Sequence, residues 1–232
     1  MNSSRSYALA PVTLLLFAGL LLLPALPVAS AEESLSAKQE LSLLVSRVKS
    51  GEGFQSHFVQ SLTAPGAKKT LSKGTLVYRA PGKMLLRYSD PEGQWLSLDG
   101  NHMALYVPQN RQVLLRTIRK HRIPETPAIL LASIPQISKW FFVKPIESGD
   151  VPPGAPLSLV LIPRHPDPHL AQATLTLKKG TGTLTRLLFM EQNGTRLSIR
   201  LEGFKVLAHV QQKDLAVSVP PGTTAAKIPG AF

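Results

Sequence analysis

The sequence contains no cysteine and few acidic residues. Its 232 residues include 14 aspartates and glutamates against 26 lysines and arginines. Without cysteine no disulfide bond can form, so the folded chain must be held together by its own apolar core. The same absence excludes attachment of a lipid to an N-terminal cysteine of this protein. Aromatic residues make up only 6% of the chain, and it has no basic motif studded with aromatic side chains of the kind that nucleic-acid modules carry.

Motifs of the common enzyme classes are also absent. The chain has no Gly-x-Ser-x-Gly, no His-Glu-x-x-His and no Gly-x-x-x-x-Gly-Lys-Ser/Thr motif, so we expect neither catalysis nor a bound cofactor. One stretch, His165-Pro-Asp167-Pro-His169, alternates possible metal ligands. No further histidine or cysteine completes an obvious site, so a proline-rich hairpin loop explains it better than a metal.

The formal net charge of +12 predicts attraction to anionic partners. Lipid headgroups and acidic proteins fit this charge better than nucleic acid, although the charge could simply serve solubility. A basic run marks one candidate docking surface, and its alternative is a solvated loop. The candidate docking residues are Arg116, Arg119, Lys120 and Arg122.

The N-terminus has the pattern of a secretory signal peptide. Arg5 precedes an apolar run from Pro11 to Val28, and Ala29-Ser30-Ala31 supplies small residues for cleavage. The alternative is a membrane anchor, but the run is marginal in length and interrupted by prolines. We therefore predict a signal peptide at residues 1–31 and an exported domain at 32–232. About 200 residues suit a single domain with a sizeable core.

Three short helices are expected in the exported part. The first has a capping box from Ser36 to Gln39, an apolar stripe at helical spacing, and Gly51 at its end. The second opens at Thr126-Pro127, where a capping residue precedes a proline at the first helical position. Pro135 begins the third, which includes Trp140. The last two are too short to be stable alone and must pack against other elements.

The remaining sequence alternates strand-like runs with turn residues such as Asn193-Gly194. The fold class expected is α+β, mostly β: a single curved antiparallel sheet of about 11 strands that forms an incomplete β-barrel covered by short helices. Strands are predicted from 54 onward and at 70–79, 83–89, 94–98, 102–107, 111–118, 157–163, 170–178, 183–191, 195–206 and 214–219.

The order and spacing of these markers resemble those of the periplasmic outer-membrane lipoprotein carriers, the LolA family. The matching fragments are Phe58-x-Gln60, Gly74 to Pro81, Trp95-x-x-x-Asp99-Gly100, Tyr106-x-Pro108, Thr126-Pro127 to Leu131, and Val217-x-Val219-Pro220-Pro221-Gly222. Each fragment alone is weak, but together they cover nearly the whole exported chain.

The resemblance implies a monomeric periplasmic chaperone. It would take acylated lipoproteins from an ATP-driven transporter of the inner membrane, shield their acyl chains, and deliver them to an outer-membrane receptor. A carrier of another amphiphile, such as a glycolipid or a polyene lipid, stays open as an alternative on the same scaffold. A regulator that senses mislocalised lipoproteins is a second alternative. A hydrolase of lipid esters is a third, and turnover of an acyl ester by the pure protein would favour it.

The resemblance also implies two sets of site residues. In the family an arginine before the proline of the first hairpin latches the helical lid. Arg79 matches it, and Arg87 is the fallback because Ala80 separates Arg79 from Pro81. The alternative for Arg79 is a solvated charge at a strand end. The candidate acyl-chain cavity consists of apolar sheet and lid positions, each of which could instead be ordinary core: Phe58, Leu76, Tyr78, Leu86, Tyr88, Trp95, Leu98, Leu105, Leu130, Leu131, Ile134, Trp140, Leu161, Leu188 and Phe204.

Overall fold

The computed structural model describes residues 29–118, 123–146 and 155–228. Most of the predicted signal peptide therefore lies outside the described residues, as do the candidate docking residues Arg119, Lys120 and Arg122. Within the described ranges, no helix is long and apolar enough to cross a membrane.

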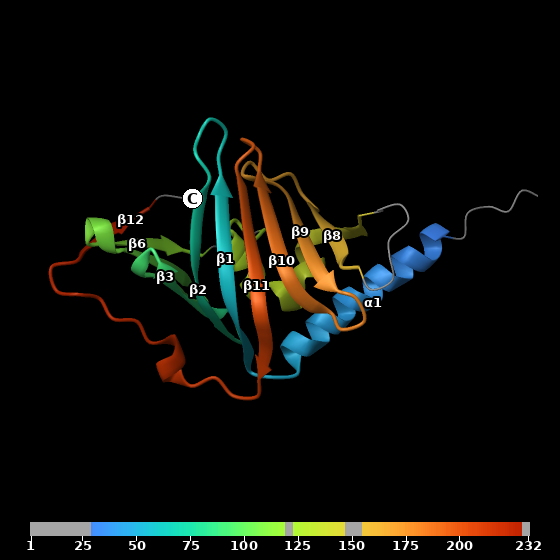
Figure 1. Cartoon of the computed structure of the whole chain (residues 1–232), viewed down its shortest axis with the longest axis horizontal. Coiled ribbons are helices and arrows are strands. Elements are labelled where there is room, and N and C mark those ends of the chain that lie inside the picture. The colour runs from blue at the N-terminus through green and yellow to red at the C-terminus, as the bar shows by residue number, and fades with distance from the viewer. Residues whose placement is uncertain (1–28, 119–122, 147–154, 229–232) are drawn as a thin grey trace, which may run out of the picture.

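One sheet carries all the strands of the described chain (Figure 1). Its order is β12-β6-β5-β4-β3-β2-β1-β11-β10-β9-β8-β7, so β12 and β7 are its edges and the sheet is not closed. The strands are β1 (Gly53–Thr63), β2 (Thr70–Arg79), β3 (Lys83–Asp90), β4 (Glu92–Asp99), β5 (His102–Val107), β6 (Gln112–Thr117), β7 (Phe141–Pro145), β8 (Leu157–Pro163), β9 (Leu170–Lys178), β10 (Thr183–Glu191), β11 (Arg196–Leu207) and β12 (Thr224–Lys227).

The predicted fold class is confirmed, with three corrections. The sheet has 12 strands instead of about 11, and its last strand pairs in parallel with β6. A strand was expected at 214–219, but the 3₁₀ helix η3 (Gln212–Leu215) ends within this range and residues 216–219 have no regular secondary structure. Arg87 donates to the carbonyl oxygens of Asp214 and Ala216, which are therefore satisfied without a neighbouring strand.

Helices cover part of the inner face of the sheet. They are α1 (Ala29–Lys49), α2 (Pro127–Ala132) and α3 (Ile137–Trp140), with the 3₁₀ turn η2 (Ile134–Gln136) between the last two. Another 3₁₀ turn, η1 (Pro108–Asn110), joins β5 to β6 and has no buried residue. The predicted cap of α2 is confirmed, since the Thr126 side chain accepts from the Ile129 N–H at 3.3 Å. The predicted start of the first helix at Ser36 is wrong, because α1 already begins at Ala29. The added residues include alanine and glutamate, which favour helix.

Alternation along the strands separates an inner face from an outer face. Inward side chains join α1, α2 and η2 in one large buried cluster that includes Phe54, Phe58 and Leu175. A smaller cluster lies on the outer face, where Trp95 stacks on Tyr106 with their ring centroids 5.7 Å apart. Residues 208–223, which we call the C-terminal arm, run from β11 to β12 and cover this outer cluster (Figure 1).

Helix α1 is attached to the turn between β9 and β10 through a buried carboxylate. Glu40 accepts the backbone N–H groups of Gly180 and Gly182. Gly182 has a φ of +58°, and a Cβ atom there would lie 2.6 Å from the backbone nitrogen of Leu44. This turn therefore needs a glycine, both for its left-handed backbone and for the close approach of the helix.

Substitution of Gly182 by alanine is expected to lower the free energy of unfolding by about 2–4 kcal/mol, from the backbone conformation together with the clash. Urea denaturation would measure this loss. Gly180 is the matched control, because its φ is +80° but nothing lies within 4 Å of its added Cβ. Gly180→Ala should therefore cost only about 1 kcal/mol. If both variants lose the same free energy of unfolding, the close approach of α1 to Gly182 does not contribute to the loss.

Candidate functional site

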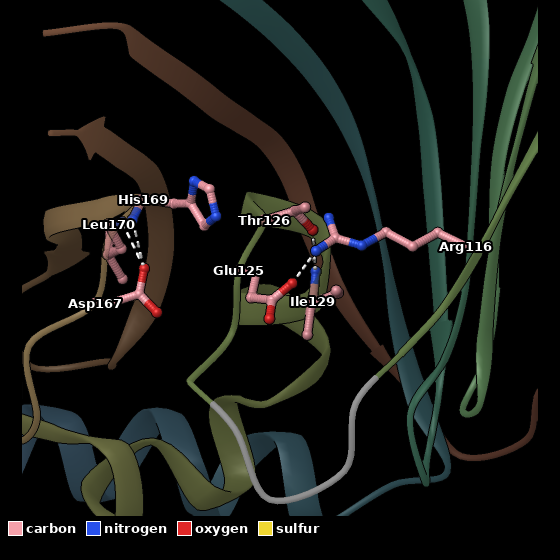
Figure 2. Close-up of polar contacts among 7 residues, drawn as sticks. All are labelled: Arg116, Glu125, Thr126, Ile129, Asp167, His169 and Leu170. Atoms are coloured by element: carbon pink, nitrogen blue, oxygen red, sulfur yellow. Dashed lines mark hydrogen bonds and ion pairs between the residues drawn. The ribbon is translucent and has the colours of Figure 1, made fainter. Parts of the chain in front are cut away.

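A cavity of about 380 Å³ lies under the start of α2, on the inner face of the sheet. Its walls come from the curved sheet, through β1, β3, β4, β5, β10 and β11, and its roof comes from α2 and the residues before it. Figure 2 shows the start of α2 within the curve of the sheet. The lining residues are Gln60, Leu62, Leu86, Tyr88, Gln94, Leu96, Met103, Leu105, Glu125, Thr126, Pro127, Ala128, Glu191, Thr195, Leu197 and Ile199.

The predicted cavity residues divide into four groups, of which three face inward. Leu86, Tyr88 and Leu105 line the cavity in the structure. Trp140 and Phe204 are half-buried against the core, and the others that face inward are fully packed in it. The packed ones are Phe58, Leu76, Tyr78, Leu98, Leu130, Leu131, Ile134 and Leu161.

Two of the predicted cavity residues lie on the outer face instead. Trp95 alternates with Gln94 and Leu96, which line the cavity, so it must point outward. There it belongs to the outer cluster and donates from Nε1 to the Ser218 carbonyl oxygen of the C-terminal arm at 3.2 Å. Leu188 lies between the inward-facing Leu187 and Phe189 and is likewise outside, where it is half-buried. An apolar side chain on this sheet therefore need not face the cavity.

Polar residues at the cavity were missed by the sequence reasoning, which took only apolar positions. Gln60 of β1 and Gln94 of β4 line the cavity, as do Glu191 at the end of β10 and Thr195 just before β11. A signal was present in the sequence. Gln60 follows Phe58 at strand spacing, so the two residues point to the same face.

Gly74 brings two aromatic rings together beside the cavity. It lies on β2, paired with Phe58 of β1 on one side and with Tyr88 of β3 on the other. A Cβ atom at Gly74 would come within 2.0 Å of the Arg87 carbonyl oxygen. Without a side chain there, the rings of Phe58 and Tyr88 meet edge to face with centroids 5.1 Å apart.

The hydroxyl of Tyr88 is held between two glutamines. It donates to Oε1 of Gln60 at 3.5 Å. Burial raises the pKa of Tyr88 to about 12, and this effect outweighs that of a hydrogen bond with Gln94, which lowers the pKa. At neutral pH the residue is therefore an uncharged phenol.

An ion pair joins the sheet to the start of α2. Arg116 of β6 reaches inward and donates to Oε2 of Glu125, next to the capping residue Thr126 (Figure 2). The two side chains are only 5% and 14% exposed. Arg116 was expected to be a docking residue on the surface. It faces inward because it pairs across the strands with Met103, which lines the cavity.

The two arginines predicted to latch the lid contact the C-terminal arm instead. Arg79 donates to the Val210 carbonyl oxygen at 3.3 Å and to Oε1 of Gln212 at 2.8 Å. Arg87 binds the same arm further along, by donating to the carbonyl oxygens of Asp214 and Ala216. Tyr78 and Tyr88 are buried on the inner face, so the neighbouring positions 79 and 87 point outward.

The stretch with alternating histidine and aspartate forms a turn. Oδ1 of Asp167 accepts the backbone N–H groups of His169 at 2.9 Å and Leu170 at 2.8 Å (Figure 2). Its carboxylate therefore shapes the chain just before β9. Across the described ranges, no group of three or more potential metal ligands occurs.

Curated relatives match most of the chain. It is 24% identical over 213 residues to an outer-membrane lipoprotein carrier protein of Pseudomonas putida strain W619, covering 90% of this chain and 97% of that protein. The corresponding protein of Pseudomonas paraeruginosa strain PA7 is 28% identical over 163 residues, which cover 70% and 74% of the two chains.

A solved structure shares the fold, and a family model matches most of the chain. The fold resembles an uncharacterized conserved protein from Thermus thermophilus with a TM-score of 0.51 and 12% identity, over 83% of this chain and 99% of that one. Residues 49–215 match the family described as outer membrane lipoprotein carrier protein LolA. The protein therefore belongs to the LolA family.

Proposed function

We propose that this protein is a periplasmic carrier that encloses the acyl chains of lipoproteins on their way from an inner-membrane transporter to an outer-membrane receptor. The observation that carries the proposal is the cavity under α2, whose walls are built largely of leucine, isoleucine and methionine. An apolar cavity of this kind can enclose hydrocarbon chains, which is what a carrier of acyl chains requires.

Membership of the family supports the absence of catalysis. LolA-family proteins are periplasmic carriers and not enzymes, so the prediction of a non-enzymatic protein is confirmed. A carrier of this class needs a closed but openable apolar space and no reactive groups.

Burial of hydrocarbon would supply the affinity. Each methylene removed from water contributes about 0.8 kcal/mol, so even part of one acyl chain outweighs a single polar contact. The volume of about 380 Å³ lies at the small end of the range for small-molecule sites. Several acyl chains need more space, and the cavity would gain it by movement of its roof.

Helix α2 is the element of the roof best suited to move. It has only six residues, too few to be stable without its packing. The ion pair between Arg116 and Glu125 lies at its start and ties it to β6. We infer that this pair takes the latch role expected of Arg79, holding the empty cavity closed until acyl chains displace α2.

Release of lipoproteins from spheroplasts tests the carrier function directly. The purified protein is incubated with spheroplasts whose lipoproteins carry radiolabelled palmitate, and label is measured in the soluble fraction. Label should leave the membrane in a complex with the protein, and heat-denatured protein serves as the control. If the lipoproteins stay on the membrane, and mass spectrometry finds another amphiphile bound to the purified protein, the proposed cargo is wrong.

The basic run still predicts an electrostatic contribution to docking. Reversing Arg119, Lys120 and Arg122 to glutamate is expected to slow cargo handover about tenfold at low salt, because charge complementarity mainly raises association rates. The difference from the original protein should shrink as ionic strength increases. Handover assays at several salt concentrations measure this. Equal rates at low salt would show that these three charges serve solubility.

A further inference from the structure

We propose that Gln60, Tyr88 and Gln94 form a polar subsite inside the cavity that binds the ester or amide carbonyl groups joining acyl chains to a neutral headgroup. This inference rests on the proposed carrier function. It adds a means of recognising where a hydrocarbon chain ends and its linkage begins.

The three side chains come from three different strands but gather on one wall. Gln60 lies on β1, Tyr88 on β3 and Gln94 on β4, and all three line the cavity. Their neighbours on the same wall are apolar, among them Leu86 and Leu96. Amide groups that face an apolar cavity lose hydrogen bonds with water, and this loss is unfavourable unless other polar groups replace those hydrogen bonds. Two glutamines at such positions indicate a ligand with polar groups of its own.

The hydrogen-bonding capacity of the subsite fits a carbonyl group. Within the described part of the chain, the side-chain hydrogen bond of Gln60 is the one that its Oε1 accepts from Tyr88. The Nε2 group of Gln60 therefore keeps its donors for a ligand. Gln94 uses one N–H for its hydrogen bond with Tyr88 and brings a second N–H to the same wall. Ester and amide carbonyls are acceptors that two such donors can bind, and an amide ligand can also donate in return.

The charges at the cavity favour a neutral linkage. Glu125 and Glu191 are the acidic residues of the lining. Arg116 pairs with Glu125, and Oε2 of Glu191 accepts from the Asn193 amide at 3.2 Å. Tyr88 remains a neutral hydroxyl. A phosphate group would bring more negative charge toward the Glu191 carboxylate, whereas a glyceride ester or an N-acyl group brings none.

Gly74 and Phe58 position the subsite. Because Gly74 has no side chain, the ring of Tyr88 can lie over β2 against the ring of Phe58. This contact places the Tyr88 hydroxyl beside Gln60. The fragment Phe58-x-Gln60 then has two functions. Phe58 is a positioning residue, and Gln60 is a ligand-binding residue.

Paired lipids that differ only in their linkage test the inference. Dipalmitoylglycerol has two ester carbonyls, and dihexadecylglycerol has the same chain length but ether linkages. Each is supplied from cyclodextrin, and binding is followed by displacement of a fluorescent fatty acid. The original protein is expected to bind the ester lipid about tenfold more tightly, as for one or two well-formed hydrogen bonds. Dipalmitoyl phosphatidic acid should bind more weakly than dipalmitoylglycerol.

Leucine substitutions assign the preference to the subsite. Gln60→Leu and Gln94→Leu should each weaken binding of the ester lipid about three- to tenfold and leave the ether lipid at least as tightly bound. Gln55→Leu is the matched control, since Gln55 lies on the same strand but is exposed on the outer face. It should preserve the preference for the ester. Thermal unfolding of each variant checks that the fold is intact.

The outcomes separate this inference from the carrier proposal. Equal binding of ester and ether lipids by the original protein would overturn the subsite while leaving the carrier intact. Equal loss of both lipids in Gln60→Leu would also overturn it, because that result indicates packing. Phosphatidic acid bound as tightly as dipalmitoylglycerol would contradict the preference for a neutral linkage. Failure to bind any of the lipids would overturn the carrier proposal itself.

Discussion

Replacement of Arg116 by leucine is expected to produce a carrier that accepts acylated cargo but releases it at least tenfold more slowly. The substitution removes the ion pair with Glu125 that ties α2 to β6. In the original protein, acyl chains must break this contact to enter, and its re-formation helps to expel them. In the variant the closed form loses the stabilisation that the ion pair provides. The equilibrium therefore shifts toward the open, loaded form.

The expected size follows from the strength of such contacts. Charge-assisted hydrogen bonds contribute about 1.5–3 kcal/mol, and a coupling of about 1–3 kcal/mol corresponds to a 5–150-fold change in affinity. Binding of a fluorescent fatty acid should tighten by a factor in this range. Transfer of radiolabelled lipoprotein from the variant to outer membranes should slow by a similar factor.

Two further variants separate a latch from a general effect on folding. Removal of one partner from a buried pair leaves the other charge uncompensated and is destabilising. The double variant Arg116→Leu with Glu125→Leu avoids this and should keep the slow release. Arg79→Leu is the matched control, because Arg79 contacts the C-terminal arm and not α2. If Arg79→Leu slows release and Arg116→Leu does not, the latch has been assigned to the wrong arginine.

Strand positions were predictable because turn residues and alternation are local signals. Nearly all predicted strands occur within a residue or two of their expected ends, and the helix cap at Thr126 is where its sequence pattern places it. The parallel strand β12 was missed for a physical reason. Its partner β6 is far away in the sequence, and a four-residue strand after Pro220-Pro221-Gly222 has no strong pattern of its own.

Alternation groups residues by face but does not say which face encloses the cavity. Trp95 and Leu188 were assigned inward because they are apolar, yet this sheet also has apolar residues outside, among them the cluster beneath the C-terminal arm. Arg116 was assigned outward because it is charged. Its spacing gave the better signal, since it shares a face with Leu114 and Ile118, and Ile118 packs against the core.

The cavity itself could not be predicted from the sequence. The sequence does not distinguish an inward-facing leucine that touches another side chain from one that borders an empty space. Leu86 and Leu76 illustrate this, since they pair across β2 and β3 and are both fully buried. Only Leu86 lines the cavity. The difference depends on the distance to the opposite wall, which residues far apart in the chain determine together.

Filling the cavity with a larger side chain is expected to abolish most lipid binding without unfolding the protein. Leu197 of β11 lines the cavity and pairs across the strands with Leu62 of β1. A tryptophan there would occupy the space of about four methylenes, and at roughly 0.8 kcal/mol each their exclusion weakens binding about 100-fold. The added ring enters an existing hollow, so the strain of overpacking should be small compared with that in a filled core.

The neighbouring strand provides a matched control for this change. Leu188 is on β10 and half-buried like Leu197, but it faces outward. Leu188→Trp should therefore retain lipid binding and spheroplast release, while Leu197→Trp loses both. Displacement of a fluorescent fatty acid and thermal unfolding would be measured for the two variants side by side. If Leu197→Trp folds normally and still binds acyl chains with its original affinity, the cavity under α2 is not where the cargo is held, and the proposed function loses the observation that carries it.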